Sequence, residues 1–317
     1  MDFTFLGTGA GMPAKERNVS ALAVSFPEYD GDLWLFDCGE GTQRQILYTP
    51  VRLPKLSAIF ITHLHGDHIY GLPGILGSRS FQTDERSLTV IGPVGIRKFI
   101  ETALNVSKTH LRYPLMFKEM NEKGTVFENA HFSVTAAPLD HGVPSFGFRI
   151  VERDQPGELR VDKLCGMGIT PGPIYRQFKE REFVTLADGR VLCAADFLGP
   201  VKKGRVTVIL GDTRPCAEAA DLAQGADVIV HEATFRQKDA ALAHDYHHST
   251  SVQAAKLAKS AAASMLILNH ISSRYQKADQ QGLLSEARSV FQQTMLATDL
   301  WTWVLGHGSS HQRHSSV

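Results

Sequence analysis

His63-Leu64-His65-Gly66-Asp67-His68 places four candidate metal ligands within six consecutive residues. The segment follows the apolar run 58–62, which is typical of a buried strand. His63 and His65 lie two positions apart, so we expect both side chains on the same side of the extended chain. Imidazole nitrogens and carboxylate oxygens are the ligands that Zn²⁺ and Mn²⁺ take in hydrolytic sites. The segment therefore predicts a metal centre at the end of a strand, with chance clustering of histidines as the alternative.

Short β-branched runs alternate with longer helical stretches along the rest of the chain. We expect strands at residues 2–6, 20–26, 33–37, 57–62, 88–92, 131–137, 145–151, 205–211, 226–231, 264–269 and 299–305. We expect helices at residues 40–48, 68–81, 94–104, 214–224, 249–262 and 281–293. Strand 57–62 is apolar on both faces, which indicates a sheet covered on both sides. An α/β protein with two sheets packed face to face and helices outside would use all these strands, but periodicity alone leaves a doubly wound sheet open.

The composition is that of an ordinary globular protein, with 317 residues, of which 43% are hydrophobic and 21% charged. No apolar run reaches the roughly 18 residues of a membrane-spanning helix, and the N-terminal segment does not resemble a signal peptide. The four cysteines lack Cys-x-x-Cys spacing, as expected of reduced thiols. We therefore expect a cytoplasmic protein with no membrane partner. Because the net charge is zero, any binding of nucleic acid must depend on local charge.

Residues 152–204 interrupt the alternating pattern. They contain Pro156-Gly157, Pro171-Gly172-Pro173 and Gly199-Pro200, with little continuous apolar periodicity. Lys and Arg only slightly outnumber Asp and Glu in this segment, which a solvated loop would also explain. We predict a single domain over residues 1–317, with residues 152–204 inserted as an arm that projects from the core.

Three further segments each end an apolar run with a potential ligand: Leu139-Asp140-His141, Leu210-Gly211-Asp212 and Leu268-Asn269-His270. Together with His-x-His-x-Asp-His they resemble the metallo-β-lactamase superfamily, whose fold is a four-layered αββα sandwich with two metal ions at one edge. The resemblance implies that one ion is held by His63, His65 and His141. It implies that the other is held by Asp67, His68 and His270, and that Asp212 bridges the two. Two Zn²⁺ ions per subunit are expected, with Mn²⁺ as the alternative, and Asp37 is expected to support the histidine ligands from behind.

Several segments are similar to the ribonuclease Z (tRNA 3′-endonuclease) family within that superfamily. They are Pro13-Ala14-Lys15-Glu16-Arg17-Asn18, residues 37–45, Ser78-Arg79-Ser80, His231-Glu232-Ala233-Thr234 and His248-Ser249-Thr250. The resemblance runs from about Leu6 to Phe291. It implies an endoribonuclease that removes the 3′ trailer of precursor tRNA and leaves a 3′-hydroxyl on the tRNA. A phosphodiesterase of broader scope and an RNA exonuclease are the enzymatic alternatives, and a silent RNA-binding subunit is disfavoured because every ligand is present.

Breaking the phosphodiester bond requires a proton for the departing oxygen. The resemblance assigns this general acid to His248, with Glu232 holding its imidazole in the protonated form. Asp67 can orient the attacking water or accept its proton. Without the resemblance, Glu232 would be read as a surface carboxylate and His248 as a residue at a helix N-terminus. His247 stands where the family usually has Gly, and His244 and His247 are expected to face solvent.

The inserted segment corresponds to the family's flexible arm, which grips the tRNA away from the catalytic centre. Its Gly168–Pro173 stretch matches the family's Gly-Pro motif. Contacts with precursor tRNA are expected from two basic groups: Lys15, Arg17 and Arg274 near the cleavage site, and Arg176, Lys179, Arg181, Lys202 and Lys203 on the arm. The resemblance also implies a homodimer in which the arm of one subunit serves the site of the other.

Overall fold

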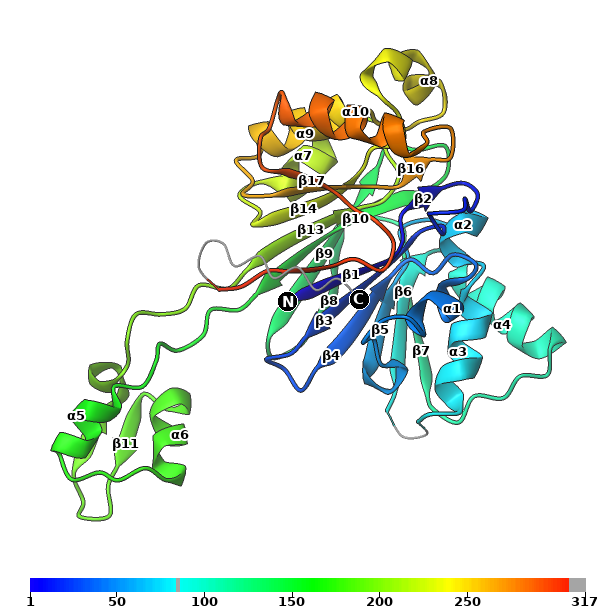
Figure 1. The fold of residues 1–317 in the computed structure, drawn as a ribbon. Helices are drawn as coiled ribbons and strands as arrows, with labels where there is room; N and C mark the ends of the chain where they lie inside the picture. Colours follow the sequence, from blue (N-terminus) through cyan, green and yellow to red (C-terminus); the bar gives the residue numbers. More distant parts are fainter. Residues whose placement is uncertain (84–85, 308–317) are drawn as a thin grey trace.

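Two mixed β-sheets pack face to face in the computed structural model, which describes residues 1–83 and 86–307 (Figure 1). In this part of the chain each large sheet has seven strands. The first has the order β18 (Thr302–Val304), β1 (Asp2–Gly7), β3 (Ala21–Phe26), β4 (Asp32–Phe36), β5 (Leu56–Phe60), β6 (Leu88–Pro93) and β7 (Leu115–Met120). The second has the order β17 (Thr294–Leu296), β15 (Leu266–Asn269), β14 (Val228–Glu232), β13 (Val206–Leu210), β10 (Ser145–Glu152), β9 (Phe132–Leu139) and β8 (Gly124–Glu128).

Helices cover the outer face of each sheet, which confirms the predicted αββα sandwich and rules out the doubly wound alternative (Figure 1). The first sheet is covered by α1 (Thr42–Ile46), α2 (Gly66–Ile69), α3 (Leu72–Ser80) and α4 (Ile96–Val106). The second is covered by α7 (Ala217–Ala223), α9 (Ser251–Ser260) and α10 (Lys277–Arg288). Shorter elements are β2 (Gly9–Ala10), which pairs with β16 (Ile271–Ser272), α8 (Ala240–Asp245) and the 3₁₀ turns Leu53–Lys55 and Gln237–Asp239. Among the described residues, no helix combines the length and apolar character needed to cross a membrane.

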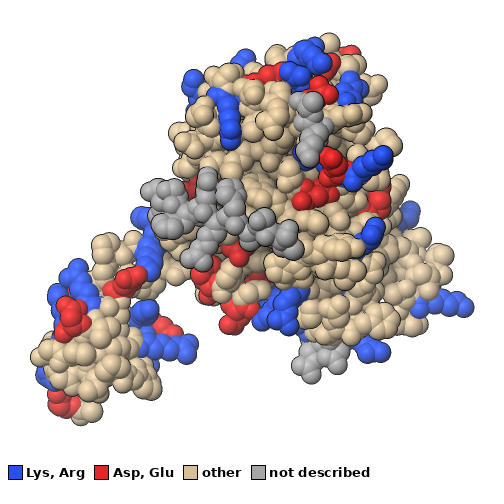
Figure 2. Space-filling model, viewed as in Figure 1, with Lys and Arg blue, Asp and Glu red and all other residues tan. Residues whose placement is uncertain are grey.

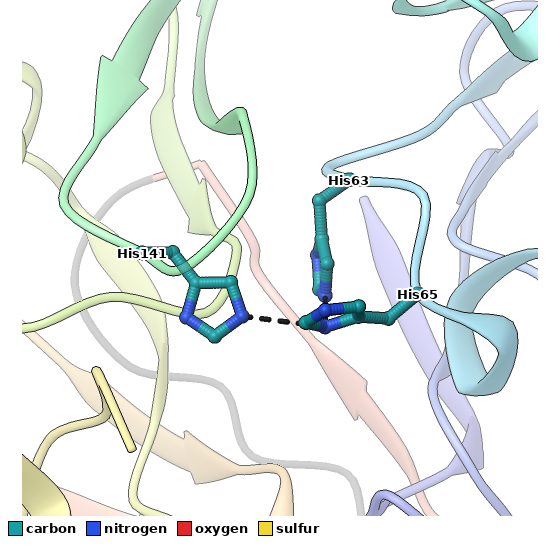
Figure 3. A group of neighbouring side chains, drawn as sticks. All are labelled: His63, His65 and His141. Atoms are coloured by element: carbon teal, nitrogen blue, oxygen red, sulfur yellow. Dashed lines mark hydrogen bonds between the residues drawn. The ribbon is translucent and has the colours of Figure 1, made fainter. Parts of the chain in front are cut away.

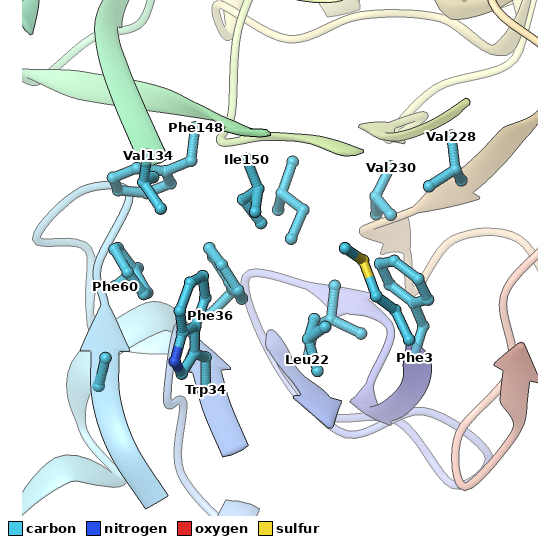
Figure 4. Close-up of a cluster of buried hydrophobic side chains, with 14 of the residues drawn as sticks. Phe3, Leu22, Trp34, Phe36, Phe60, Val134, Phe148, Ile150, Val228 and Val230 are labelled. Atoms are coloured by element: carbon cyan, nitrogen blue, oxygen red, sulfur yellow. The ribbon is translucent and has the colours of Figure 1, made fainter. Parts of the chain in front are cut away.

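Aromatic side chains fill the space between the sheets (Figure 4). Phe36 and Phe60 stack with ring centroids 4.8 Å apart, and Phe148 of the opposite sheet packs against Phe60 at 5.4 Å. Trp34 is fully buried among Phe26, Phe60, Phe127 and Phe132. Strand β5 meets this core on one face and the helices on the other, which explains why its sequence is apolar on both faces.

The structure corrects several predicted elements. The helix expected at 68–81 is two helices, because Gly71 separates α2 from α3 and lies so close to the Gly39 carbonyl that a Cβ would collide with it. Strands β7, β8 and β17 were not expected. Strand β7 lies at the edge of its sheet with alternating exposed residues, so its sequence, Leu115-Met116-Phe117-Lys118-Glu119-Met120, lacks a clean apolar pattern.

The segment between β10 and β13 projects away from the two sheets (Figure 1). It contains α5 (Val161–Gly166), α6 (Pro173–Glu180), the 3₁₀ turn Ala194–Phe197 and a hairpin of β11 (Phe183–Thr185) and β12 (Val191–Cys193). These elements bury a small apolar cluster of their own, including Leu164, Phe178 and Phe197. No helix or strand was named within this segment from its sequence, because short elements around a small core do not produce a long apolar repeat.

A buried ion pair joins the two strands at the base of this segment. Glu152 ends β10 and Arg205 precedes β13, and the guanidinium Nε and Nη2 donate to the two carboxylate oxygens at 2.7 and 2.8 Å. The phenol of Tyr29 donates a third hydrogen bond at 2.7 Å. Burial alone would raise the pKa of Glu152, but the hydrogen bonds from Arg205 and Tyr29 lower it to about 2.

We predict that Arg205→Met lowers the free energy of unfolding by about 3–5 kcal/mol at neutral pH, because it leaves the Glu152 carboxylate buried without its partner. The pair stabilises the parent fully above the ordinary pKa of Glu152, 4.5, and this contribution is lost as pH falls through about 2. The difference between parent and variant, measured by urea unfolding, should therefore shrink between these two pH values. Arg190→Met removes the exposed pair with Asp188 and should cost no more than about 1 kcal/mol; equal losses would contradict the account.

Candidate metal centre

The candidate ligands meet where strands of both sheets end. Strands β4 and β5 are parallel in the first sheet, as are β13, β14 and β15 in the second, and β9 runs in the same direction as β13. Parallel strands bring their carboxyl ends to one edge. The residues that follow these ends are Asp37, His63, Asp212, Glu232, His270 and His141.

His63, His65 and His141 turn their rings toward a common point (Figure 3). The distance from His65 Nδ1 to His63 Nε2 is 3.1 Å, and to His141 Nε2 it is 3.3 Å. A tetrahedral zinc ion with bonds of 2.0–2.1 Å separates its ligands by about 3.3 Å. The spacing of these nitrogens therefore fits a bound ion of this kind.

Asp67, His68 and His270 form a second group whose ligand atoms also lie within 4.8 Å of one another. The Nε2 atoms of His68 and His270 are 3.2 Å apart, and Asp67 Oδ2 lies 3.5 Å from each. The two groups together are typical of a binuclear metal site.

Asp212 lies between the two groups and is buried. Its Oδ2 is 3.6 Å from His63 Nε2 in the first group and 3.3 Å from His270 Nε2 in the second. Burial alone would raise the pKa of Asp212, but His270, His68 and His63 hold it well below its ordinary value. A carboxylate that remains ionised here can neutralise positive charge on both sides.

The electrostatics of the imidazoles differ between the groups. Burial lowers the pKa of His63 and His141, which favours the neutral form that binds metal. Burial would also lower the pKa of His68, but Asp212 and Asp37 on either side raise it. An ion that binds to His68 Nε2 must therefore displace a proton, so metal loading should weaken toward acid pH.

Asp37, which directly follows β4, lies behind His68. Its Oδ2 accepts a hydrogen bond from His68 Nδ1 at 2.8 Å and another from the Thr62 hydroxyl at 2.8 Å. Its Oδ1 accepts from the Thr62 amide at 2.8 Å. Because Nδ1 carries the proton in this contact, Nε2 is the ring nitrogen that faces the site and would give up its proton to an ion.

Glu232 and His248 form a second contact beside the ligands. His248 Nδ1 lies 2.9 Å from Glu232 Oε1 and 3.9 Å from Asp212 Oδ2. Burial alone would lower the pKa of His248, but the Glu232 carboxylate raises it to about 9. The Glu232 carboxylate therefore favours the cationic form of the imidazole through the contact at Nδ1.

Comparison with known proteins agrees with this geometry. A ribonuclease Z from Bacillus cereus (strain G9842) is 58% identical over 300 residues, which cover 95% of this chain and 98% of the relative. The chain belongs to the ribonuclease Z family. The crystal structure of human tRNase Z, short form, matches with a TM-score of 0.71 and 30% identity, covering 98% of this chain and 100% of the human one.

Two further matches concern the fold and one half of the chain. The metallo-β-lactamase fold protein YhfI from Bacillus subtilis matches with a TM-score of 0.65 and 19% identity over 95% of this chain and 98% of the other, which shows a common fold. A family model described as anti-Pycsar protein Apyc1 matches residues 1–150. Membership of the ribonuclease Z family, together with the His and Asp groups, makes the chain a metal-dependent hydrolase.

The basic residues assigned to substrate lie in different surroundings. Lys15 is exposed and lines a cavity of about 390 Å³ between the family's Pro-x-Lys-x-Arg-Asn loop and residues 271–280. Arg17 in the same loop is buried, and its guanidinium donates to the Ala297 carbonyl and to Gln280. These hydrogen bonds hold the Arg17 guanidinium inside the fold, although the residue also lines the same cavity as Lys15. Arg274 is exposed, with its guanidinium 5.1 Å from the centre of the Phe235 ring.

The predicted arm residues are all exposed or partly exposed, but three of them form ion pairs. Arg176 pairs with Glu180, Lys202 with Glu158 and Lys203 with Asp154. Figure 2 shows basic and acidic side chains interspersed over the arm, in agreement with its small excess of positive charge. These exposed pairs are weak, so a phosphate can compete for the cations.

Sequence reasoning missed Thr234, although the residue stands in the quoted His-Glu-Ala-Thr motif. Its hydroxyl donates to Glu232 Oε2 at 2.6 Å and accepts from His270 Nδ1 at 3.0 Å. Glu232 also accepts the amide of Thr213 at 3.0 Å. Thr234 therefore links the His248–Glu232 pair to the ligand His270.

We predict that Asp37→Asn lowers the affinity for the ion at Asp67, His68 and His270 by about 10- to 100-fold, because the donors of His68 and Thr62 surround both oxygens and the amide NH2 would have to face at least one of them. Metal content after dialysis against graded chelator concentrations would measure this. The matched control is Asp32→Asn at the other end of β4, which contacts Trp34 and Arg86 and should retain both ions. Retention of both ions by Asp37→Asn would contradict the assignment.

Proposed function

We propose that this chain cleaves precursor tRNA with two bound Zn²⁺ ions and releases a tRNA with a 3′-hydroxyl and a trailer with a 5′-phosphate. As a ribonuclease Z, it is a tRNA 3′-processing endonuclease. The observation that carries the proposal is the convergence of seven candidate ligands at one edge of the sandwich, in a chain 58% identical to a ribonuclease Z over 95% of its length.

In this proposal His63, His65 and His141 would hold one ion, Asp67, His68 and His270 would hold the other, and Asp212 would be shared between them. Two divalent ions bring four positive charges, of which Asp67 and Asp212 neutralise two. The remaining charge suits an anionic phosphodiester. When bound, the ions lower the pKa of water and stabilise charge on the phosphate oxygens. Zinc is preferred to manganese because five of the ligands are histidines.

The departing 3′ oxygen receives its proton from His248 in this proposal. Glu232 accepts a hydrogen bond from Nδ1 of His248 and favours the cationic ring. The proton on Nε2 is then the one that can be transferred. Water attacks phosphorus and gives up one proton to solvent, the bond from phosphorus to the 3′ oxygen breaks, and the proton from His248 completes the 3′-hydroxyl. Asp67 has a further proposed role, to orient the water. Its Oδ2 is held in place by a hydrogen bond from the Gly11 amide at 2.7 Å.

We predict that His248→Ala slows single-turnover cleavage by about 10²- to 10⁴-fold with little change in the binding of precursor tRNA. A substrate with sulfur in place of the departing 3′ oxygen needs little protonation and should be cut by His248→Ala at a rate much closer to that of the parent. His244→Ala, in an exposed histidine on α8, is the control and should cut both substrates normally. An equal loss on both substrates would remove His248 from the role of general acid.

The segment between Glu152 and Arg205 is the proposed tRNA-binding arm. It leaves the sandwich at the end of β10 and the start of β13, whereas His141 and Asp212 lie at the opposite ends of these strands. Strand β10 has 8 residues, which span about 26 Å. The arm base therefore lies far from the metal centre of its own chain and the arm points away from it (Figure 1). This supports a homodimer in which each arm serves the site of the partner subunit.

The two chain segments at the base of the arm lie close enough to be joined directly. The backbone of Gly157 touches that of Gly199, and the Gly199 amide donates to the Glu158 carbonyl at 2.8 Å. We predict that joining Glu158 to Gly199 lowers precursor tRNA cleavage at least 100-fold but preserves hydrolysis of bis(p-nitrophenyl) phosphate, because the small substrate needs only the metal centre. Equal loss on both substrates would count against the arm's role.

Mixing the arm-deleted protein with the His248→Ala variant tests whether the arm of one subunit binds tRNA for the site of the other. A heterodimer would pair an intact arm with an intact site, so cleavage should recover above the sum of the two variants. If cleavage does not recover although mass measurement shows that mixed dimers have formed, the proposal that each arm serves the partner's site is contradicted.

Mapping the cut distinguishes an endonuclease from the exonuclease alternative, since only the former releases an intact trailer. Residence in the cytoplasm, where precursor tRNA is processed, stays a prediction.

A further inference from the structure

The helix α8 (Ala240–Asp245) ends in a hydrogen-bonded motif that leads directly into His248. The His247 amide donates to the His244 carbonyl at 3.2 Å, and the His248 amide donates to the Ala243 carbonyl at 2.7 Å. His247 has a φ of 57°, in the left-handed region. These two bonds and one left-handed residue form a Schellman motif, in which glycine usually occupies the place of His247.

The carbonyl of His247 points at a candidate metal ligand. His141 Nδ1 lies 2.9 Å from this oxygen. A carbonyl only accepts, so Nδ1 of His141 must carry the proton and Nε2 must present its lone pair. That Nε2 is the atom 3.3 Å from His65 Nδ1 within the group drawn in Figure 3.

The imidazole of His247 does not account for this arrangement. Its Nδ1 has no hydrogen-bond partner among the described residues and lies 3.9 Å from Asp140 Oδ1. His247 is connected to the site through its backbone: its amide donates to the His244 carbonyl and its carbonyl accepts from His141. We had expected His247 to face solvent, and its ring is indeed partly exposed while its carbonyl turns inward.

We propose that His247 is a positioning residue whose left-handed backbone orients His141 for metal binding and places His248 beside Glu232. The inference rests on the proposed function, since it takes His141 as a metal ligand. One helix end thus serves both the ion and the general acid: rotation of the His247 backbone out of the left-handed region would withdraw the carbonyl from His141 and move His248, the next residue.

The test is a graded series at one position: His247→Gly, His247→Ala and His247→Val. All three remove the imidazole, but the left-handed conformation becomes harder to adopt from Gly to Ala to Val. Full-length protein loaded with two zinc ions is titrated with a chromophoric chelator. We expect one ion of His247→Val to be released about 10- to 100-fold more readily than in the parent, His247→Ala to be intermediate, and His247→Gly to stay within about threefold.

Two controls separate the possible causes. Helix α9 ends in the same motif, where Ala262 has a φ of 52° and its amide donates to the Lys259 carbonyl at 3.2 Å. Ala262→Val strains this exposed turn at the far end of α9 and should release zinc as the parent does. A second readout is the Nδ1–H proton of His141 in ¹⁵N-histidine spectra, which should be protected from exchange in the parent and in His247→Gly but lost in His247→Val.

Equal zinc release by His247→Gly and His247→Val would overturn the inference, whether both resemble the parent or both lose the ion, because the backbone would then make no difference. His141→Ala tests the underlying assignment separately. If His141→Ala keeps both ions as tightly as the parent, the proposed ligand set fails; if it loses one while the graded series stays flat, only the positioning role of His247 fails.

Discussion

The Asp212 carboxylate, buried where the two sheets meet, is the interaction on which the site depends. An isolated charge in such a place is strongly unfavourable, so its burial requires neighbouring groups that stabilise the negative charge. His63 and His68 come from the first sheet and its helix, and His270 comes from the second. Because these partners belong to opposite sheets, the centre can form only when the sheets have packed. Binding of metal is therefore coupled to the packing of the sandwich.

Around this centre, three of the candidate histidine ligands donate a hydrogen bond from Nδ1 to a group behind the ring, which fixes the position of the proton. His68 donates to Asp37, His270 to the Thr234 hydroxyl, and His141 to the His247 carbonyl. Glu232 joins the same network through Thr234 and also holds His248. The residues that hold the ions and the residue proposed to move the proton therefore share their supports, so a change at one should be felt at the other.

The candidate ligands named from the sequence lie together in the structure because strand ends converge at one edge. The four-layered sandwich was implied by the resemblance to the metallo-β-lactamase superfamily, since the two apolar faces of β5 fit a doubly wound sheet equally well. The sequence could not predict the surroundings. Arg17 stands in a substrate-binding motif, but Gln280 and Ala297, far along the chain, pack over its guanidinium. The spacing of His63 and His65 in the sequence indicates that their side chains lie on one side of the chain. No such pattern indicates the role of the His247 backbone, which depends on the turn after α8. Edge strand β7 and the arm's small core lack a long apolar period, so they gave no signal.

The central claim is that seven side chains from two sheets hold a pair of ions with Asp212 between them. Anomalous diffraction from crystals of the zinc-loaded protein, recorded on both sides of the zinc absorption edge, tests it most directly. The account predicts two zinc peaks per chain, about 3.5–4 Å apart, with one Asp212 oxygen shared between them. A single fully occupied ion, or two ions outside the histidine groups, would contradict it.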